Sequence, residues 1–325
     1  MKLAKSNKYE VVQYPKIDNL NIFINAMVYC SPHLHKDFEL IYVLEGELTL
    51  MCSGERHEGL TGDMLLVNPN QPHEFYTYGA VGATFLCLQV SPKFFRDTFP
   101  MMSDVSFDII KLQPREFDSW CEQIRSCCIR MATAYMDPDF QNRLLCASAC
   151  HELFHILIKH VPHSFLTAAE QQAASWKAER ILRLIDFVES NFMHKINLKE
   201  FADAEGVSLN HMSHFVKKNL NHNFQEYVTD IRFNHARKLL ALGNKRLIDV
   251  CLESGFSDTR YLTKAFMRKL GTSPDAYRRN FSAQDSRTHD LSDHSGMYDW
   301  YPHSAQMIYS DEESARILSY ISSFH

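Results

Sequence analysis

Hydrophobic and polar positions follow two different periods along this chain. Apolar residues come in short runs over residues 38–44, 47–52, 64–67 and 73–78, and glycine, proline or asparagine separates the runs. Short strands at 8–12-residue spacing with such turn residues are typical of a small β-barrel or jelly roll. We therefore expect residues 20–90 to form one.

The period becomes helical between residues 114 and 159. Apolar side chains recur three to four positions apart, and Asp137-Pro138-Asp139 interrupts the pattern. This spacing predicts two helices that each bury one face. Residues 162–174 are small and polar, which favours a linker between domains.

Residues 198–281 contain a repeat with an offset of fifty. Each copy is a short amphipathic helix that ends at a glycine (Gly206, Gly255) and continues into a second helix rich in polar and basic residues. Glycine suits the positive φ of a tight turn, and the serines that follow could cap the next helix. The pattern predicts two helix-turn-helix units. Residues 223–242 predict one connecting helix, whose length of about 27 Å would hold the units as a rigid pair.

The charge supports a nucleic-acid partner once it is divided along the chain. The whole protein of 325 residues has a net charge of −5. Residues 175–287 contain 19 Lys and Arg against 13 Asp and Glu, which leaves 15 against 26 for the rest. Basic charge thus gathers on the repeat, where it could meet phosphates.

Other features exclude several classes of protein. The sequence shows no signal-peptide pattern and no run of eighteen apolar residues, so we expect a cytoplasmic protein without membrane contact. Nine cysteines occur without a C-x-x-C pair. We interpret them as buried reduced thiols rather than zinc ligands or disulfides.

The second unit of the repeat contains Ser254-Gly255-Phe256-Ser257-Asp258, Tyr261-Leu262, Phe266, Gly271, Ser273-Pro274 and Tyr277-Arg278-Arg279. In these residues it resembles the DNA-binding domain of the AraC family of bacterial transcription regulators. The first unit matches more loosely, through Ala202, Gly206-Val207-Ser208, Phe215 and Lys217-Lys218.

The resemblance implies an α+β multidomain fold. We expect a cupin-like effector-sensing barrel over 1–112, a helical dimerisation region over 113–161 and a linker over 162–174. An all-α double helix-turn-helix domain would follow over 175–287, and an atypical acidic extension over 288–325.

The resemblance also implies which residues contact DNA. The family's base-reading positions fall on Asn210, Ser213 and His214 in the first unit and on Thr259, Arg260, Thr263 and Lys264 in the second. Arg and Lys favour guanine, so the second unit is expected to supply most base discrimination. Lys217, Lys218 and Arg268 either meet phosphates or merely solvate the surface.

The segment His33-x-His35-x3-Glu39-x6-Gly46, with the later Pro69-x2-Pro72-His73, resembles a cupin barrel. Positions 33, 35 and 39 share parity, so on one extended strand all three side chains would face the interior. Metal-dependent cupins use this pattern for ligands, and such donors suit a divalent transition metal. Three interpretations stay open: a metal site, a polar pocket for an organic effector, and structural histidines. We favour the organic effector and expect no metal and no cofactor.

We expect a transcription regulator, not an enzyme, controlled by a small-molecule effector such as a sugar or sugar derivative. The alternatives are a metal-dependent cupin enzyme fused to a DNA-binding module and an effector-independent regulator. The resemblance implies a double-stranded DNA operator, RNA polymerase and a second copy of the chain as partners. The apolar face over 140–161, with Leu153 and Leu157, would form the homodimer unless it packs on its own barrel.

The acidic segment 288–325 lies beyond the usual end of this family. Ser310 to Glu313 could cap a short helix with an apolar stripe through Ile317, Leu318 and Ile321. The segment is either a partly ordered tail or a helix that docks onto the protein or a partner.

Overall fold

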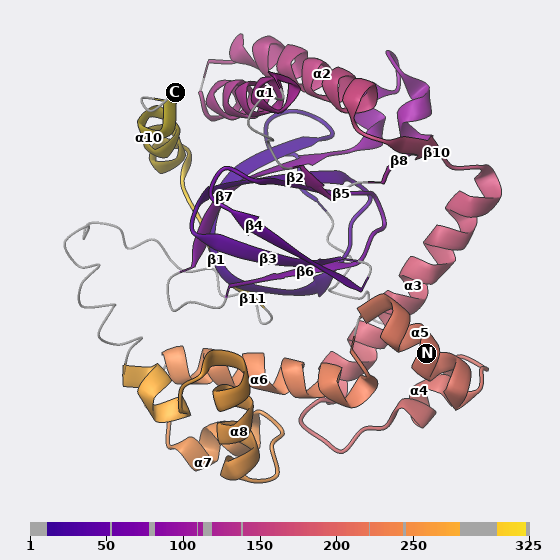
Figure 1. Ribbon diagram of the computed structural model, residues 1–325, viewed down its shortest axis with the longest axis vertical. Helices are drawn as coiled ribbons and strands as arrows, with labels where there is room; N and C mark the ends of the chain where they lie inside the picture. The colour runs from indigo at the N-terminus through magenta and orange to yellow at the C-terminus, as the bar shows by residue number, and fades with distance from the viewer. Residues whose placement is uncertain are drawn as a thin grey trace.

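A computed structural model describes residues 12–52, 54–77, 82–108, 110–112, 119–137, 139–220, 222–242, 245–279 and 304–322. A curved sheet lies at the centre, with two helices above it and a group of helices below it (Figure 1). The strands of this sheet are β1 (Leu20–His33), β2 (Phe38–Glu45), β3 (Glu47–Cys52), β4 (Glu55–Leu60), β5 (Met64–Val67), β6 (His73–Tyr76), β7 (Ala83–Val90), β9 (Lys111–Leu112) and β11 (Ser304–Ile308). The expected barrel-like domain is confirmed.

The sheet has the order β4-β3-β6-β1-β7-β2-β5-β9, with β11 on β1, and its pairs are antiparallel. Gly46 turns β2 into β3 with φ of 90°, which a residue with a side chain rarely adopts. The strand β2 is buried on both faces. Leu40 packs toward the helices above the sheet, while Ile41 belongs to the core enclosed by β3, β5 and β7. Glu39 shares the parity of Ile41 and so faces the interior.

Helices α1 (Ser119–Met136) and α2 (Asn142–His160) cover one face of the sheet (Figure 1). Leu153 and Leu157 are fully buried in the core that α1, α2 and the strands share. The prediction that Leu153 and Leu157 form a dimer interface is therefore wrong, because both leucines pack in the core of their own domain. The exposed apolar side chains of this region are Phe140, Leu144 and Leu145, which are 71%, 79% and 63% exposed.

The expected linker over 162–174 has regular structure instead. Residues 163–165 form β10 (His163–Phe165), which pairs with β8 (Val105–Phe107). The strand β8 follows two short 3₁₀ helices in the chain, η1 (Pro92–Phe95) and η2 (Pro100–Asp104). A capping box of Thr167 and Glu170 then starts α3 (Ala168–Asn191). The polar segment therefore begins a helix, because Thr167 and Glu170 satisfy backbone N–H groups at its N-terminus.

The lower group of helices contains both predicted helix-turn-helix units. They are α4 (Leu198–Ala204) with α5 (Leu209–Leu220) and α7 (Leu247–Glu253) with α8 (Thr259–Leu270), joined by α6 (Phe224–Leu242). Gly206 and Gly255 have φ of 68° and 75°, as the turns require. A Cβ on Gly255 would lie 2.5 Å from the carbonyl oxygen of Phe192 at the end of α3. Close packing therefore demands glycine there in addition to the turn.

The C-terminal extension docks on the barrel domain. Strand β11 pairs with β1 from Asn25 to Cys30, and α10 (Asp311–Ser322) packs against α1 (Figure 1). Ser310 and Glu313 form the expected cap, and Leu318 is 2% exposed. Lys16 binds Asp311 at 2.7 Å. Of the two interpretations, docking onto the protein is the one observed for residues 304–322.

Candidate functional sites

The first helix-turn-helix unit presents the outer face of α5. Ser208 accepts a hydrogen bond from the backbone N–H of His211, so it caps the helix as expected. Met212 and Val216 are buried against the rest of the domain, whereas Asn210, Ser213 and His214 are exposed. Lys217 and Lys218 are exposed in the last turn. The predicted contact residues of this unit therefore share one accessible surface.

The second unit repeats this arrangement with more charge. Leu262 and Phe266 are fully buried, while Arg260 and Lys264 are exposed and Thr259 and Thr263 are half-buried. An α-helix of this kind fits the major groove of B-DNA, and residues in its first turns reach base edges. The assignment of bases to these residues remains a prediction.

Asp258 organises the start of α8. It caps the helix through the backbone N–H of Arg260 (2.7 Å), and it also accepts hydrogen bonds from Nε and Nη2 of the Arg260 side chain, both at 3.0 Å. The cap is thus Asp258 and not the preceding Ser257. Because the Arg260 side chain is 86% exposed, Asp258 holds a solvent-facing guanidinium at the N-terminus of α8.

The last turn of α8 is attached to α6. Asp230 of α6 lies 2.8 Å from Nζ of Lys269 and 4.0 Å from Nη2 of Arg268. Tyr261 and Met267 share the exposed surface of α8, at 60% and 51% exposure, and were not predicted as contacts. Their helical spacing from Lys264 places them on the same side of α8.

The barrel brings four predicted residues together in its interior. One ligand atom from each of His33, His35, Glu39 and His73 lies within 4.8 Å of all the others. His33 is 9% exposed, and the other three are at most 3% exposed. The prediction that His33, His35 and Glu39 lie on one extended strand is wrong, because β1 ends at His33, a bend follows His35, and Glu39 belongs to β2. The turn between the strands, together with β6, assembles the cluster.

Neighbouring backbone atoms orient two of the imidazoles. Nδ1 of His35 lies 3.0 Å from the carbonyl oxygen of Asp37, and Nδ1 of His73 lies 2.8 Å from that of Gln71. A carbonyl oxygen only accepts, so Nδ1 of each ring donates to it and Nε2 faces the cluster. Nε2 of His73 is 3.0 Å from Oε2 of Glu39, and Nε2 of His35 is 3.6 Å from it.

Glu39 is held as a carboxylate at the centre of the cluster. Burial alone would raise the pKa of Glu39, but hydrogen bonding and charge from His35 and His73 outweigh it and lower the pKa well below its ordinary value. Its Oε1 accepts hydrogen bonds from Cys87 (3.1 Å) and Gln89 (3.2 Å). These two residues fix the carboxylate so that Oε2 points toward the histidines.

The four residues fit a divalent transition metal. Oε2 of Glu39 and Nε2 of His73 are buried and face each other at 3.0 Å, with Nε2 of His35 at 3.6 Å from the same oxygen. Three imidazoles and one carboxylate are the mixed nitrogen and oxygen donors that such ions accept. The backbone contacts of His35 and His73 are the outer-shell support that metal-binding histidines usually have. His33, His35, Glu39 and His73 would hold the ion.

Comparison with known proteins matches both domains. Residues 25–154 match the AraC-like ligand binding domain, and residues 201–280 match a helix-turn-helix domain. Together the two matches cover most of the described chain, in the order that the structure shows. The chain belongs to the AraC family of transcription regulators.

Individual relatives of this AraC-family protein are distant. An uncharacterised HTH-type transcriptional regulator from Bacillus subtilis, YdeC, is 21% identical over 78% of the chain and 88% of its own length. The lactose operon transcription activator of Staphylococcus xylosus is 22% identical over 82% and 90%. The chain spans only 33% of the length of several Staphylococcus aureus regulators. ToxT from Vibrio cholerae has a solved structure with 12% identity and a TM-score of 0.39, over 81% of this chain and 98% of ToxT.

The AraC-family chain is thus a transcription regulator with a DNA-binding domain and a ligand-binding domain. None of the helices within the described ranges is long and apolar enough to cross a membrane.

Proposed function

We propose that this regulator changes its DNA-binding activity when a small ligand enters the cluster of His33, His35, Glu39 and His73. The observation that carries the proposal is the buried cluster itself, in the domain that matches a ligand-binding family. The carboxylate and the imidazoles converge within 4.8 Å and are buried, so a small polar ligand could bind several of them at once.

A sugar or sugar derivative is one effector class that suits the cluster. Hydroxyl groups both donate and accept hydrogen bonds, so they could meet a carboxylate and imidazoles together. The Staphylococcus xylosus relative activates a lactose operon, which is in keeping with a sugar effector. Footprinting of the bound genomic DNA would name the regulated genes and so narrow the effector.

A thermal-shift screen of metabolites tests the proposed effector site. The double variant His35→Ala, Glu39→Gln should lose the stabilisation that an effector confers on the wild-type protein, because both ligand-facing groups change. The pair His57→Ala, Glu58→Gln on β4 is the matched control, since it alters the same residue types outside the cluster. An equal shift in wild type and in the His35, Glu39 variant would place the effector elsewhere.

We infer that α5 and α8 together read a double-stranded operator and that the bound protein acts on RNA polymerase. Exposure of Asn210, Ser213 and His214 on α5 and of Arg260 and Lys264 on α8 supports this inference. The family's helix-turn-helix match covers both helices.

We also propose a homodimer, now through the exposed end of α2. Phe140, Leu144 and Leu145 form an apolar surface there, and two copies could bury it by two-fold packing. Leu144→Glu with Leu145→Glu should sediment as a monomer and lose the avidity of a two-half-site operator. Ser148→Glu is the matched control, because Ser148 is exposed on the same helix. Unchanged sedimentation of the leucine variant would reject this surface.

A further inference from the structure

Strand β1 has two edges, and the other strands of the barrel use only one of them. On that edge, residues 20–27 pair with β7 and residues 29–33 pair with β6. On the opposite edge, residues 25–30 pair with β11 of the C-terminal extension. The backbone N–H of Tyr309 continues this ladder, because it donates to the carbonyl oxygen of Ile24 at 3.0 Å. The extension therefore covers an edge that the other described strands leave open.

The sequence of β1 gives this edge no protection of its own. Residues 20–30, LNIFINAMVYC, contain no charged residue, no proline and no glycine. Open edges of such strands pair readily with other chains, and natural proteins protect them with lysine, proline or a covering segment. Both faces of β1 are also apolar, since Ile22 and Ile24 pack toward the helices and Met27 packs in the barrel. A covering segment is thus the protection that this strand has.

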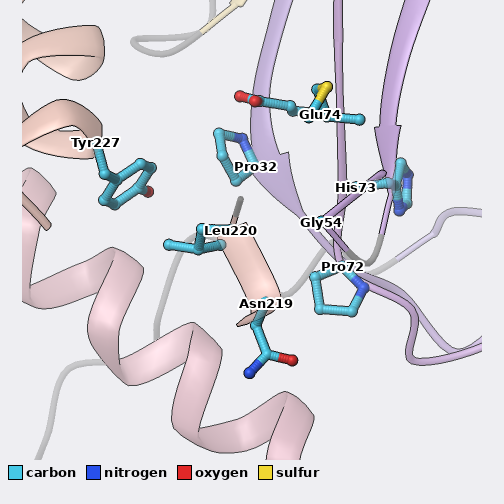
Figure 2. Close-up of a pocket in the computed structure, with 9 residues that line it drawn as sticks. Pro32, Gly54, Pro72, His73, Glu74, Asn219, Leu220 and Tyr227 are labelled. Carbon is cyan, nitrogen blue, oxygen red and sulfur yellow. The ribbon is translucent and has the colours of Figure 1, made fainter. Parts of the chain in front are cut away.

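The two ends of the edge are closed by other means. Pro32, near the end of β1, has no backbone N–H to donate. It also lines a pocket that Leu220 and Tyr227 of the DNA-binding domain close from the other side (Figure 2). At the start of the strand, the backbone N–H of Leu20 donates to the carbonyl oxygen of Ile17 at 3.1 Å. The part of the edge that needs a cover is therefore the part that β11 occupies.

Helix α10 fastens the cover to the domain. Leu318 is 2% exposed in the core that α1, α2 and the sheet share, and Ile317 packs against that core. Nζ of Lys16 lies 2.7 Å from Oδ2 of Asp311 and donates to the carbonyl oxygen of Tyr135 at 3.0 Å. These contacts join the first turn of α10 to the last turn of α1. The ion pair is partly exposed, so the buried leucine is the stronger anchor.

We propose that residues 304–322 are an autoinhibitory cover that keeps β1 from pairing with a second copy of the chain. The strand β11 runs antiparallel to β1. A second β1 related by a two-fold axis would also run antiparallel, so it could occupy the same edge. Each copy would then offer the other the same uncharged strand over residues 25–30. The extension and a second copy therefore compete for one row of backbone groups.

The alternation of an antiparallel ladder identifies which backbone group to remove. Hydrogen-bonding groups of one edge recur every second residue, so the N–H of Met307 faces β1 as that of Tyr309 does. Met307→Pro removes this donor, and Leu318→Asp places a charge in the buried contact of α10. The full-length chain with both changes is the detached variant. Its matched control is Met307→Leu with Ala315→Asp, which keeps the N–H and places the charge on the exposed face of α10.

Sedimentation velocity measures the association. All chains carry Leu144→Glu and Leu145→Glu, so that the apolar surface of α2 does not contribute. The detached variant and a chain truncated after residue 303 should each sediment at about twice the mass of the full-length chain at the same concentration. The matched control should keep the mass of the full-length chain. If the truncated chain does not fold, the detached variant decides, and an unchanged mass of that variant would overturn the proposal.

A lysine on β1 shows whether this strand is the surface that associates. Ala26 is half-buried and pairs with Met307, so Ala26→Lys adds to the uncovered edge the residue type that protects natural edge strands. In the detached variant, this change should restore the mass of the full-length chain. A synthetic peptide of residues 304–322 should do the same for the truncated chain, and a peptide with Leu318→Asp should not. Association that survives Ala26→Lys would lie on another surface and overturn the proposal.

Discussion

The two helix-turn-helix units arise from one repeated pattern, yet they have different surroundings. The first unit lies next to α3 and the barrel, where Leu220 at the end of α5 closes a pocket with Glu74 (Figures 1 and 2). The second lies at the other end of α6 and exposes Arg260 and Lys264 at the start of α8. Similar local sequences thus have different surroundings: the first unit contacts the barrel, and the second exposes more positive charge.

The turns of the two units should differ most in their tolerance of a side chain. Gly255→Ala should destabilise the protein by about 3 kcal/mol or more, because a left-handed φ costs about 1–2 kcal/mol and overpacking adds to it. The added Cβ would meet the carbonyl of Phe192 at 2.5 Å and Cα of Met193 at 2.8 Å. Gly206→Ala should cost only about 1–2 kcal/mol, since nothing lies within 4 Å. Urea denaturation of both variants measures this difference. Equal losses of stability in the two variants would show that the positive φ, and not the close packing at Gly255, sets the cost of a side chain.

The second largest difference is expected between α5 and α8, in how substitutions affect operator binding. Lys264→Ala or Arg260→Ala should cost about 1–3 kcal/mol on the specific operator and relax preference at one base position. Ser213→Ala on α5 should cost less, because a short hydroxyl forms at most one base contact. Anisotropy titrations with the operator and single-base variants decide this. If Ser213→Ala altered preference more than Lys264→Ala, the first unit would be the principal reader.

The attachments to α3 differ in their response to pH. Glu205 of the first unit binds Arg183 (2.6 Å) and Arg180 (3.0 Å) of α3, and these arginines lower the pKa of Glu205 below its ordinary 4.5. A lowered folded-state pKa means that the stabilisation is present above pH 4.5 and is lost as the pH falls through the folded value. Glu205→Gln should cost about 1 kcal/mol near neutral pH, with solvent screening of the arginines limiting the loss.

The test is thermal unfolding at pH 7 and at pH 3.5. The difference between wild type and Glu205→Gln should shrink at the lower pH. At the second unit, Arg232 of α6 holds α3 through the backbone carbonyls of Phe192 and His194, which do not titrate. An undiminished difference at pH 3.5 would mean that Glu205 acts through packing.

The smallest expected effect concerns a phosphate contact on the first unit. Lys217→Ala should weaken binding to all sequences alike and reduce the salt slope by about 0.9. Anisotropy titrations over a range of salt concentrations measure it. A change in sequence preference instead would assign Lys217 to a base edge.

Much of the fold could be predicted from local patterns. Strands β2, β3, β5 and β6, the connecting helix α6 and both turn glycines lie where alternation, helical spacing and turn chemistry place them. The start of α3 was missed because a polar stretch resembles a linker unless the cap of Thr167 and Glu170 is recognised. Leu153 and Leu157 were misassigned because an apolar stripe has the same spacing whether it meets another subunit or its own core.

The sequence by itself determined the repeat, the charge division and the identity of the four cluster residues. These depend on residue type and on short-range spacing, which the sequence states directly. Tertiary structure alone decided that His73 meets His33, His35 and Glu39, and that Leu34 and Glu74 face the DNA-binding domain behind them. Contacts between segments many residues apart depend on how strands pair and which faces pack, and no local period encodes that choice.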